Sequence, residues 1–247
     1  MSRLQATARI VAQRGATGTT SLPEIRSAVP IVLRRTGESG PDAWVHLVGG
    51  AAGPLGGDQL RLEIVVGPGA VLRVRSVAAT LVLPGAAGEP SAWDVEVRVE
   101  AGGLLDFAPE PMVVCAGANH TTRARIDLAE GAGLRWREEF VCGRDGEEPG
   151  TTRTDLMVRH GNRPLLAHAI TVGPGAPGWN SAAGLGDARA VGTVLYAGSE
   201  VAHAPPSGAG PNLAVGALDG PGVLVTAVAA DALALRRTLD TTSSFSA

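Results

Sequence analysis

The chain has 247 residues, of which 45% are hydrophobic and 18% are charged, and its formal net charge is −3. This weakly acidic balance offers no broad basic surface for nucleic acid, and two cysteines are too few for a disulfide framework. No apolar run reaches the roughly 18 residues of a membrane helix, and the first residues lack the apolar core of a signal peptide. We therefore expect a cytoplasmic protein with a single domain over residues 1–247.

Short apolar segments separated by glycine-rich loops predict β-strands along most of the chain. Residues 60–66 alternate between apolar and charged side chains, which is the pattern of a strand with one buried face. Residues 78–83 are apolar throughout, as in a strand buried on both faces. Residues 173–222 are rich in glycine and proline, so we expect long loops there around one strand near residues 191–196. The other predicted strands are residues 8–11, 29–33, 44–48, 72–76, 93–99, 124–128, 151–158 and 165–172.

A strand–turn–strand unit occurs three times. Each copy places two apolar residues six positions apart around a turn that contains glycine. The copies are spaced by 33 and 29 residues, and short strands at such spacing indicate an all-β sandwich or a solenoid of stacked coils. The three apolar pairs are Val66 and Leu72, Val99 and Leu105, and Leu128 and Leu134.

The C-terminal segment predicts one α-helix. Its apolar residues recur at intervals of three or four, which places them on one face of a helix, and Arg236 lies in the last turn, where a cation favours the helix dipole. We expect a disordered tail over about residues 241–247. The residues that define the apolar face are Val228, Ala232, Leu235 and Leu239.

Metal-binding and catalytic patterns are weak in this sequence. The spacing of Cys115, His120 and Cys142 matches no zinc-ligand pattern, and the apolar run before Cys115 predicts a buried, inert thiol. On a strand, Glu138 and Glu139 point to opposite faces and cannot act as a pair. Glu138 shares its face with apolar residues, so it is either paired with a cation or functional.

The turn at residues 143–147 allows two interpretations. Arg144 and Glu147 either close the turn with a salt bridge, which contributes little if exposed, or form a rigid charged loop that a partner recognises. Composition alone does not separate the two.

Several segments together resemble one protein family. Residues 48–58 read Val-Gly-Gly-Ala-Ala-Gly-Pro-Leu-Gly-Gly-Asp, and this approach to a Gly-Asp pair is the most specific match. Residues 76–80 read Ser-Val-Ala-Ala-Thr and residues 105–111 read Leu-Asp-Phe-Ala-Pro-Glu-Pro. Glu139 is followed by Gly143-Arg144 and Gly146-Glu147. In these blocks the chain resembles the urease accessory protein UreD family, called UreH in some organisms.

The resemblance implies a non-enzymatic scaffold for urease maturation. Members of the family bind the UreF partner, which recruits the GTPase UreG, and the assembly docks on apo-urease. Nickel is thought to pass through an internal channel, so no tightly bound cofactor is expected. The implied fold is a right-handed, β-helix-like stack of sheets with few helices, which agrees with the repeated unit.

A path for a divalent ion requires exchangeable acceptors rather than a closed cage of ligands. The candidates for transient nickel contacts are Asp58, Ser76, Glu110 and Glu139, and the candidates for partner contacts are Arg144 and Glu147. The alternative for Asp58 is an Asx-turn that starts the strand at Leu60. The alternative for the whole chain is a carbohydrate-active β-solenoid hydrolase that uses paired carboxylates.

Overall fold

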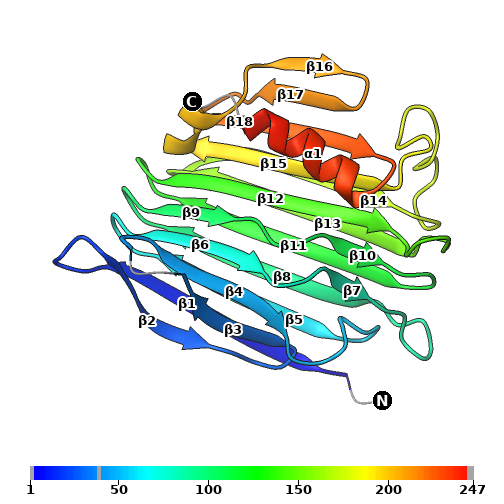
Figure 1. Cartoon of the computed structure of the whole chain (residues 1–247), viewed down its shortest axis with the longest axis horizontal. Helices are drawn as coiled ribbons and strands as arrows, with labels where there is room; N and C mark the ends of the chain where they lie inside the picture. The colour runs from blue at the N-terminus through cyan, green and yellow to red at the C-terminus, as the bar shows by residue number, and fades with distance from the viewer. Residues whose placement is uncertain (1–2, 38–39, 244–247) are drawn as a thin grey trace.

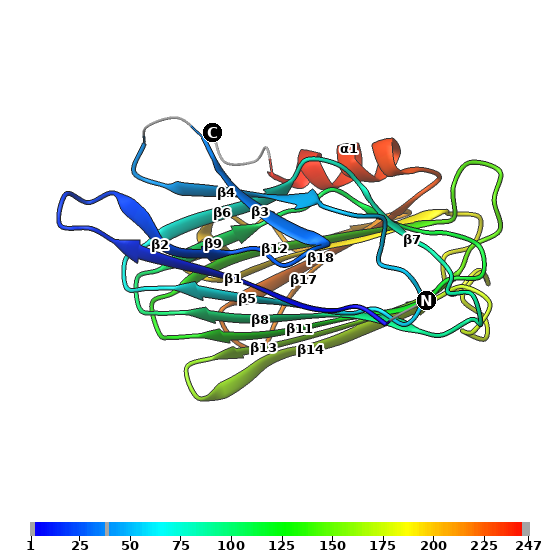
Figure 2. The same ribbon diagram turned by 90° about the horizontal axis from the view of Figure 1, so that it is seen from below.

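The computed structural model describes residues 3–37 and 40–243, which form two facing β-sheets (Figure 1, Figure 2). The first sheet has seven strands, in the order β14 (Arg163–Val172), β13 (Thr151–His160), β11 (Asn119–Leu128), β8 (Ser91–Val99), β5 (Gln59–Val66), β1 (Gln5–Arg14) and β2 (Thr20–Arg26).

The second sheet has eleven strands, two of which lie off its main path. The main path runs β16 (Gly208–Gly210), β17 (Leu213–Ala217), β18 (Gly222–Ala229), β15 (Ala190–Gly198), β12 (Gly133–Cys142), β9 (Leu104–Phe107), β6 (Val71–Ser76), β4 (Ala43–Gly49) and β3 (Ile31–Thr36). Beside it, β10 (Met112–Val114) pairs with both β12 and β7 (Thr80–Val82).

The chain alternates between the sheets and builds a β-solenoid of about four turns, so the predicted solenoid is confirmed. In the first sheet, Val99 pairs with Val66 on one side and with Leu128 on the other. In the second sheet, Leu105 pairs in the same way with Leu72 and Leu134. Each copy of the repeated unit is therefore the passage of one coil from the first sheet to the second, in register with its neighbours.

The turns between the sheets also stack on one another. Gly69, Gly102 and Gly131 occupy equivalent positions with φ of 64°, 68° and 77°, a backbone conformation that residues other than glycine rarely adopt. The Gly69 N–H donates to the Ala101 carbonyl, and the Gly102 N–H donates to the Gly131 carbonyl, both at 3.2 Å. These bonds continue the coil-to-coil pairing around the edge of the solenoid.

The space between the sheets is filled mainly by aliphatic side chains. On β5, the apolar residues of the alternating pattern are at most 3% exposed, while Arg61 and Glu63 face outward. Outward-facing charges on neighbouring strands pair laterally, as in Arg9 with Glu63 at 2.7 Å and Arg61 with Glu96 at 2.5 Å. The period-two pattern therefore separates a buried apolar face from a solvated charged one.

The one α-helix among the described residues, α1 (Ala232–Ser243), lies on the outer face of the second sheet (Figure 2). Its buried residues Leu235 and Leu239 pack over Gly192 of β15, where an added Cβ would lie 2.8 Å from Leu239 and 3.2 Å from Leu235. The absence of a side chain at Gly192 thus allows the close approach of the helix. In the described part of the chain, no helix has the length and apolar character needed to cross a membrane.

Residues 78–83 do not form the predicted strand buried on both faces. Only the three residues of β7 are strand, Ala78 and Ala79 are exposed, and Leu81 is 43% exposed. The chain leaves the second sheet after Ser76, and residues 77–79 separate β6 from β7. The apolar composition reflects an exposed apolar rim instead of a core strand.

The C-terminal third contains more strand than predicted. β18 is a strand paired on both sides, so Val228 belongs to the second sheet and not to the helix. Residues 222–229 contain three valines, which favour a strand, and pairing on both sides of β18 outweighs the helical spacing of Val228. Within residues 173–222, β16 and β17 accompany the predicted strand, now β15. The helix continues to Ser243, where a tail from about residue 241 was predicted, and residues 244–247 lie outside the described residues.

Candidate functional site

A cavity of about 390 Å³ lies between the sheets and opens through the second sheet. The opening forms where two neighbouring strands are interrupted: β6 ends at Ser76 and β9 at Phe107, while β7 and β10 begin only at Thr80 and Met112. The connecting segments contribute Val77, Ala78, Ala79, Pro109 and Glu110 to the cavity lining. We call this opening the mouth.

The interior of the cavity is largely aromatic. Four of the eight aromatic residues of the chain line it, and the rings of Phe107 and Trp136 stack with centroids 4.1 Å apart. The polar interior residues include Thr122 from the first sheet and Glu138 from the second. A mostly apolar cavity with a few placed polar groups is the usual form of a small-molecule site. The four aromatic residues are Trp93, Phe107, Trp136 and Phe140.

Glu138 is the carboxylate inside the cavity. It lies on the inner face of β12 between Trp136 and Phe140, and no ion pair to it is present among residues 3–37 and 40–243. Burial raises the pKa of Glu138 to about 7, and the indole of Trp136 opposes this shift. The sequence predicted that Glu138 is paired with a cation or functional, and a functional role for Glu138 stays a prediction. The carboxyl therefore exchanges between its neutral and charged forms near neutral pH.

Three of the four residues proposed from sequence for the nickel path meet at the mouth. Ser76, Glu110 and Glu139 all line the cavity, and the Ser76 Oγ accepts a hydrogen bond from the Glu110 N–H at 2.8 Å. Arg236 of α1 lies between the two carboxylates: its Nη1 is 2.9 and 2.8 Å from the Glu110 oxygens, and its Nη2 is 3.5 Å from Glu139 Oε2. The side chain of Glu110 is 38% exposed and that of Glu139 is fully buried.

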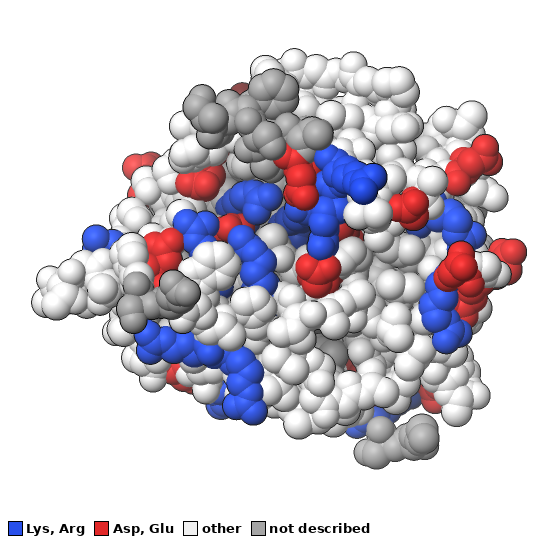
Figure 3. Space-filling model, viewed as in Figure 1, with Lys and Arg blue, Asp and Glu red and all other residues white. Residues whose placement is uncertain are grey.

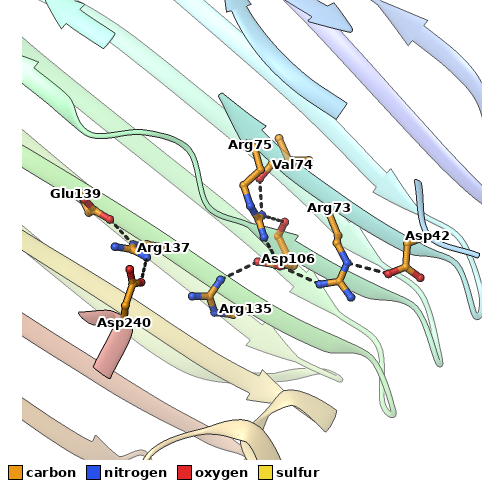
Figure 4. Close-up of polar contacts among 9 residues, drawn as sticks. All are labelled: Asp42, Arg73, Val74, Arg75, Asp106, Arg135, Arg137, Glu139 and Asp240. Atoms are coloured by element: carbon orange, nitrogen blue, oxygen red, sulfur yellow. Dashed lines mark hydrogen bonds and ion pairs between the residues drawn. The ribbon is translucent and has the colours of Figure 1, made fainter. Parts of the chain in front are cut away.

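A second arginine completes the charge cluster beneath α1. Arg137 of β12 pairs with Glu139 and, at 2.8 Å, with Asp240 of the helix (Figure 4). Burial lowers the pKa of Arg236, but the charges of Glu139 and Glu110 outweigh this effect and raise it. The ion pairs thus cross between sheet and helix in both directions.

Asp58 lies apart from these residues. It is 5% exposed, does not line the cavity, and accepts hydrogen bonds from the Leu55 N–H at 2.9 Å and the Leu4 N–H at 3.4 Å. This geometry agrees with the alternative in which Asp58 closes a turn before the strand at Leu60. A contact between Asp58 and a passing ion stays a prediction.

Arg144 and Glu147 form the salt bridge that the first interpretation of their turn describes. Arg144 Nη2 lies 2.7 Å from Glu147 Oε1, and the Arg144 N–H also donates to Glu147 Oε2 at 2.9 Å. The hydrogen bond from Arg144 lowers the pKa of Glu147 to about 2. Arg144 also lines a shallow groove with Leu81, Glu110 and Arg236, so the pair lies beside the mouth.

A further buried charge cluster was missed by the sequence reasoning. On the outer face of the second sheet, Asp106 pairs with Arg73 at 3.1 Å, with Arg75 at 2.5 Å and with Arg135 at 3.1 Å (Figure 4). Burial raises the pKa of Asp106, but Arg75 and Arg135 outweigh it and the net shift is downward. In each coil the residue after the stacked leucine belongs to this cluster: Arg73, Asp106 and Arg135. The repeat therefore predicts that these three residues lie side by side.

The prediction of a buried thiol at Cys115 is confirmed. Cys115 and Cys142 are buried free thiols, and burial raises the pKa of both. His120 is hydrogen bonded to Ser91 Oγ at 2.8 Å and to Thr122 Oγ1 at 3.2 Å, and burial lowers its pKa to about 4. Within the part of the chain that the structure describes, no group of three or more His, Cys, Asp and Glu side chains is placed to hold a metal ion.

The face of the molecule that carries the mouth is shown in Figure 3. Arginine and acidic side chains gather across its middle, in front of the strands at the centre of the second sheet and next to α1, and an uncharged area lies below them. Two apolar residues beside the mouth are exposed, Val77 by 60% and Leu81 by 43%. The mouth thus lies where a charged and an apolar surface adjoin.

Comparison with known proteins agrees with these features. A family model described as UreD urease accessory protein matches residues 4–245. Urease accessory protein UreD of Parafrankia sp. strain EAN1pec is 47% identical over 244 residues, which cover 90% of this chain and 82% of that protein. UreD of Streptomyces avermitilis is 45% identical over 240 residues, covering 96% and 95% of the two chains. UreD of Streptomyces coelicolor is 43% identical and covers 96% and 94%.

The family resemblance seen in the sequence is thereby confirmed, and with it the role of a non-catalytic accessory protein in urease maturation. The hydrolase alternative is wrong, because accessory proteins match the chain over nearly its whole length. The chain belongs to the UreD family of urease accessory proteins.

Proposed function

We propose that this chain is a cytoplasmic, single-domain scaffold that delivers nickel to apo-urease, and that Ni²⁺ passes through the cavity between its sheets. It acts in an assembly with UreF-like and UreG-like partners. The observation that carries the proposal is a cavity with two carboxylates at its mouth, Glu110 and Glu139, and a third, Glu138, inside it.

The chemistry of the path suits a passing ion. Carboxylates and hydroxyls supply oxygen contacts to a divalent cation, while the aromatic walls supply none. Two carboxylates at the mouth and one inside cannot complete a first shell of ligands, so the ion keeps water molecules and exchanges readily. The path therefore lowers the barrier to entry without holding the ion.

The surface around the mouth supports a partner at this place. Val77 and Leu81 are exposed beside it, and an exposed apolar patch with a polar border commonly marks a protein interface. Arg144, paired with Glu147, lines the adjoining groove and adds a charged border. In the proposed assembly the UreF-like partner covers this surface and shields the mouth from solvent.

The nickel path is tested by urease activation in cells that carry the urease operon. We expect Glu138→Gln to reduce the nickel content and activity of urease several-fold, because the amide keeps the shape of the side chain but cannot carry the charge that attracts the ion. Co-purification of the variant with its partners should not change. Glu130→Gln, an exposed position in a turn, is the matched control. Normal nickel loading by the triple variant of Glu110, Glu138 and Glu139 to Gln would remove the cavity from the path.

The partner surface is tested by Val77→Asp, which places a charge beside the mouth without altering buried contacts. We expect co-purification with the UreF-like partner to fall strongly. Met157→Asp is the control, since Met157 is 54% exposed on the first sheet, away from the second. Equal loss of the partner with both variants would count against this surface.

Asp58 allows a test that separates its two interpretations. Asp58→Asn keeps an oxygen that accepts the Leu55 N–H but loses the charge, whereas Asp58→Ala loses both. A turn role predicts that the Asn variant activates urease normally and the Ala variant is less stable. Reduced nickel loading by the Asn variant in a normally stable chain would place Asp58 on the path.

A further inference from the structure

The mouth of the cavity already holds a cation that belongs to the chain itself. The guanidinium of Arg236 contacts both oxygens of Glu110 and one oxygen of Glu139. These are the two carboxylates that a divalent ion would meet first on entering the cavity. An ion and Arg236 therefore compete for the same acceptors.

The two carboxylates differ in how far they depend on a counter-charge. The Glu139 side chain is fully buried, and an unpaired buried carboxylate is strongly destabilising. Glu110 is 38% exposed and Arg236 is 31% exposed, so water can solvate either of them. If Arg236 leaves the mouth, Glu139 keeps its ion pair with Arg137 but loses its second counter-charge, which another cation beside Glu139 restores.

The charges around the mouth favour such an exchange. Three carboxylates, those of Glu110, Glu139 and Asp240, face the guanidinium groups of Arg137 and Arg236. The cluster therefore carries a formal excess of negative charge even with both arginines in place. A divalent ion that replaces one guanidinium neutralises this excess, whereas a monovalent cation in the same place would leave it unchanged.

The backbone of α1 need not move during the exchange. Leu235 and Leu239 are fully buried and pack over Gly192, and Asp240 remains paired with Arg137. Arg236 lies between these anchors with its long side chain directed to the mouth. A change of rotamer is sufficient to free the carboxylates, and such changes are fast.

We propose that Arg236 is a placeholder cation: it neutralises Glu110 and Glu139 while the mouth is empty and is exchanged, side chain for ion, when a divalent cation enters. This inference rests on the proposed function, since it assigns a residue that controls entry to the same path. In this role Arg236 does not bind nickel; it holds Glu110 and Glu139 in place and competes with the ion for them.

The test is the equilibrium binding of nickel chloride to the full chain purified with its partners, measured by calorimetry at fixed ionic strength. We expect Arg236→Gln to bind Ni²⁺ about tenfold more tightly, because a competing positive charge within a few ångströms of a divalent ion is removed. Arg236→Lys keeps the charge and should stay within about twofold of the unchanged chain. Arg237→Gln, an exposed neighbour with no ion pair in the described residues, is the control and should not change.

The increase in nickel affinity must depend on the carboxylates at the mouth. Combining Arg236→Gln with Glu110→Gln should abolish it, and thermal unfolding of each variant confirms that the chain is folded. Unchanged or weaker binding by Arg236→Gln, or a gain that survives loss of the Glu110 charge, would overturn the placeholder role. The proposed function fails on a different measurement: normal nickel loading of urease in cells by the carboxylate variants. That result would not change the competition between Arg236 and the ion measured in vitro.

Discussion

β12 passes through two unlike regions of the same interior. At its start, Leu134 continues the stack of Leu72 and Leu105, all fully buried, and the sheets are in direct aliphatic contact. Four residues later, Glu138 of the same strand and the same face lines a cavity. The two regions differ in whether the neighbouring coils keep their repeat.

The cavity forms where the repeat is broken in two adjacent coils. Residues 77–79 and 108–111 interrupt strands that are continuous in β12. Pro109 and Pro111 lack the N–H group that a central strand must donate, so this segment cannot continue the ladder. Regular coils thus produce the solid half of the molecule, and an irregular insertion produces the hollow half.

The largest expected effect of a substitution on the free energy of unfolding lies in the solid half. Leu134→Ala removes a fully buried side chain from a close-packed stack and should lower the free energy of unfolding by about 3 kcal/mol. Val77→Ala, at a residue that is 60% exposed at the mouth, should change it by less than about 0.5 kcal/mol. Urea unfolding of the full chains measures both. Similar values for the two variants would contradict the division into a solid and a hollow half.

An intermediate and pH-dependent effect is expected in the hollow half. The pKa of Glu138 is raised to about 7 from its ordinary 4.5, so the protonated form stabilises the fold below pH 4.5 and this stability is lost as the pH rises through 7. Glu138→Gln cannot ionise and so does not lose this stability. Its free energy of unfolding at pH 8.5 should exceed that of the unchanged chain by about 2 kcal/mol. At pH 4.5 the two should unfold alike.

Urea unfolding at the two pH values measures this difference, with Glu130→Gln as the exposed control. An advantage of Glu138→Gln that is the same at both pH values would show that the carboxyl is not desolvated by the cavity. Water would then solvate the Glu138 carboxyl in the cavity as fully as it solvates a carboxyl on the molecular surface.

The smallest effect is expected outside both halves, in the turn at residues 143–147. Arg144→Ala breaks an exposed salt bridge and should leave the unfolding midpoint unchanged within error. Because the pKa of Glu147 is lowered to about 2, its stabilising pair is complete above pH 4.5 and is lost only as the pH falls toward 2. The result should therefore be the same at pH 5 and pH 8. A clear loss of stability would give this turn a structural importance that its exposure does not suggest.

Much of the fold was predictable because the solenoid repeats its own pattern. The six-residue spacing from Val66 to Leu72 recurs in the next two coils, and the structure pairs all three copies in register. The segment at residues 78–83 was misassigned because an apolar run has the same composition in a core strand and in an exposed rim. Val228 was misassigned because it lies at a helical interval from a real helix.

The candidate site was predictable only in part. Ser76, Glu110 and Glu139 were named from family blocks, and they do meet at the mouth. Arg236 was assigned to the helix dipole, but its partners Glu110 and Glu139 lie 126 and 97 residues away in sequence. Contacts of this range arise from how the helix docks on the sheet, which local patterns do not encode.

The reversal of strand direction at both ends of the stack has a consequence for assembly. β2 and β3 run antiparallel to β1 and β4, and β14 and β15 run antiparallel to β13 and β12. The parallel coil therefore does not continue unchanged past either terminus of the stack, because the strand there runs opposite to the coil strands. Repeat proteins without such caps can polymerise end to end, and here the chain supplies its own barrier to fibre growth.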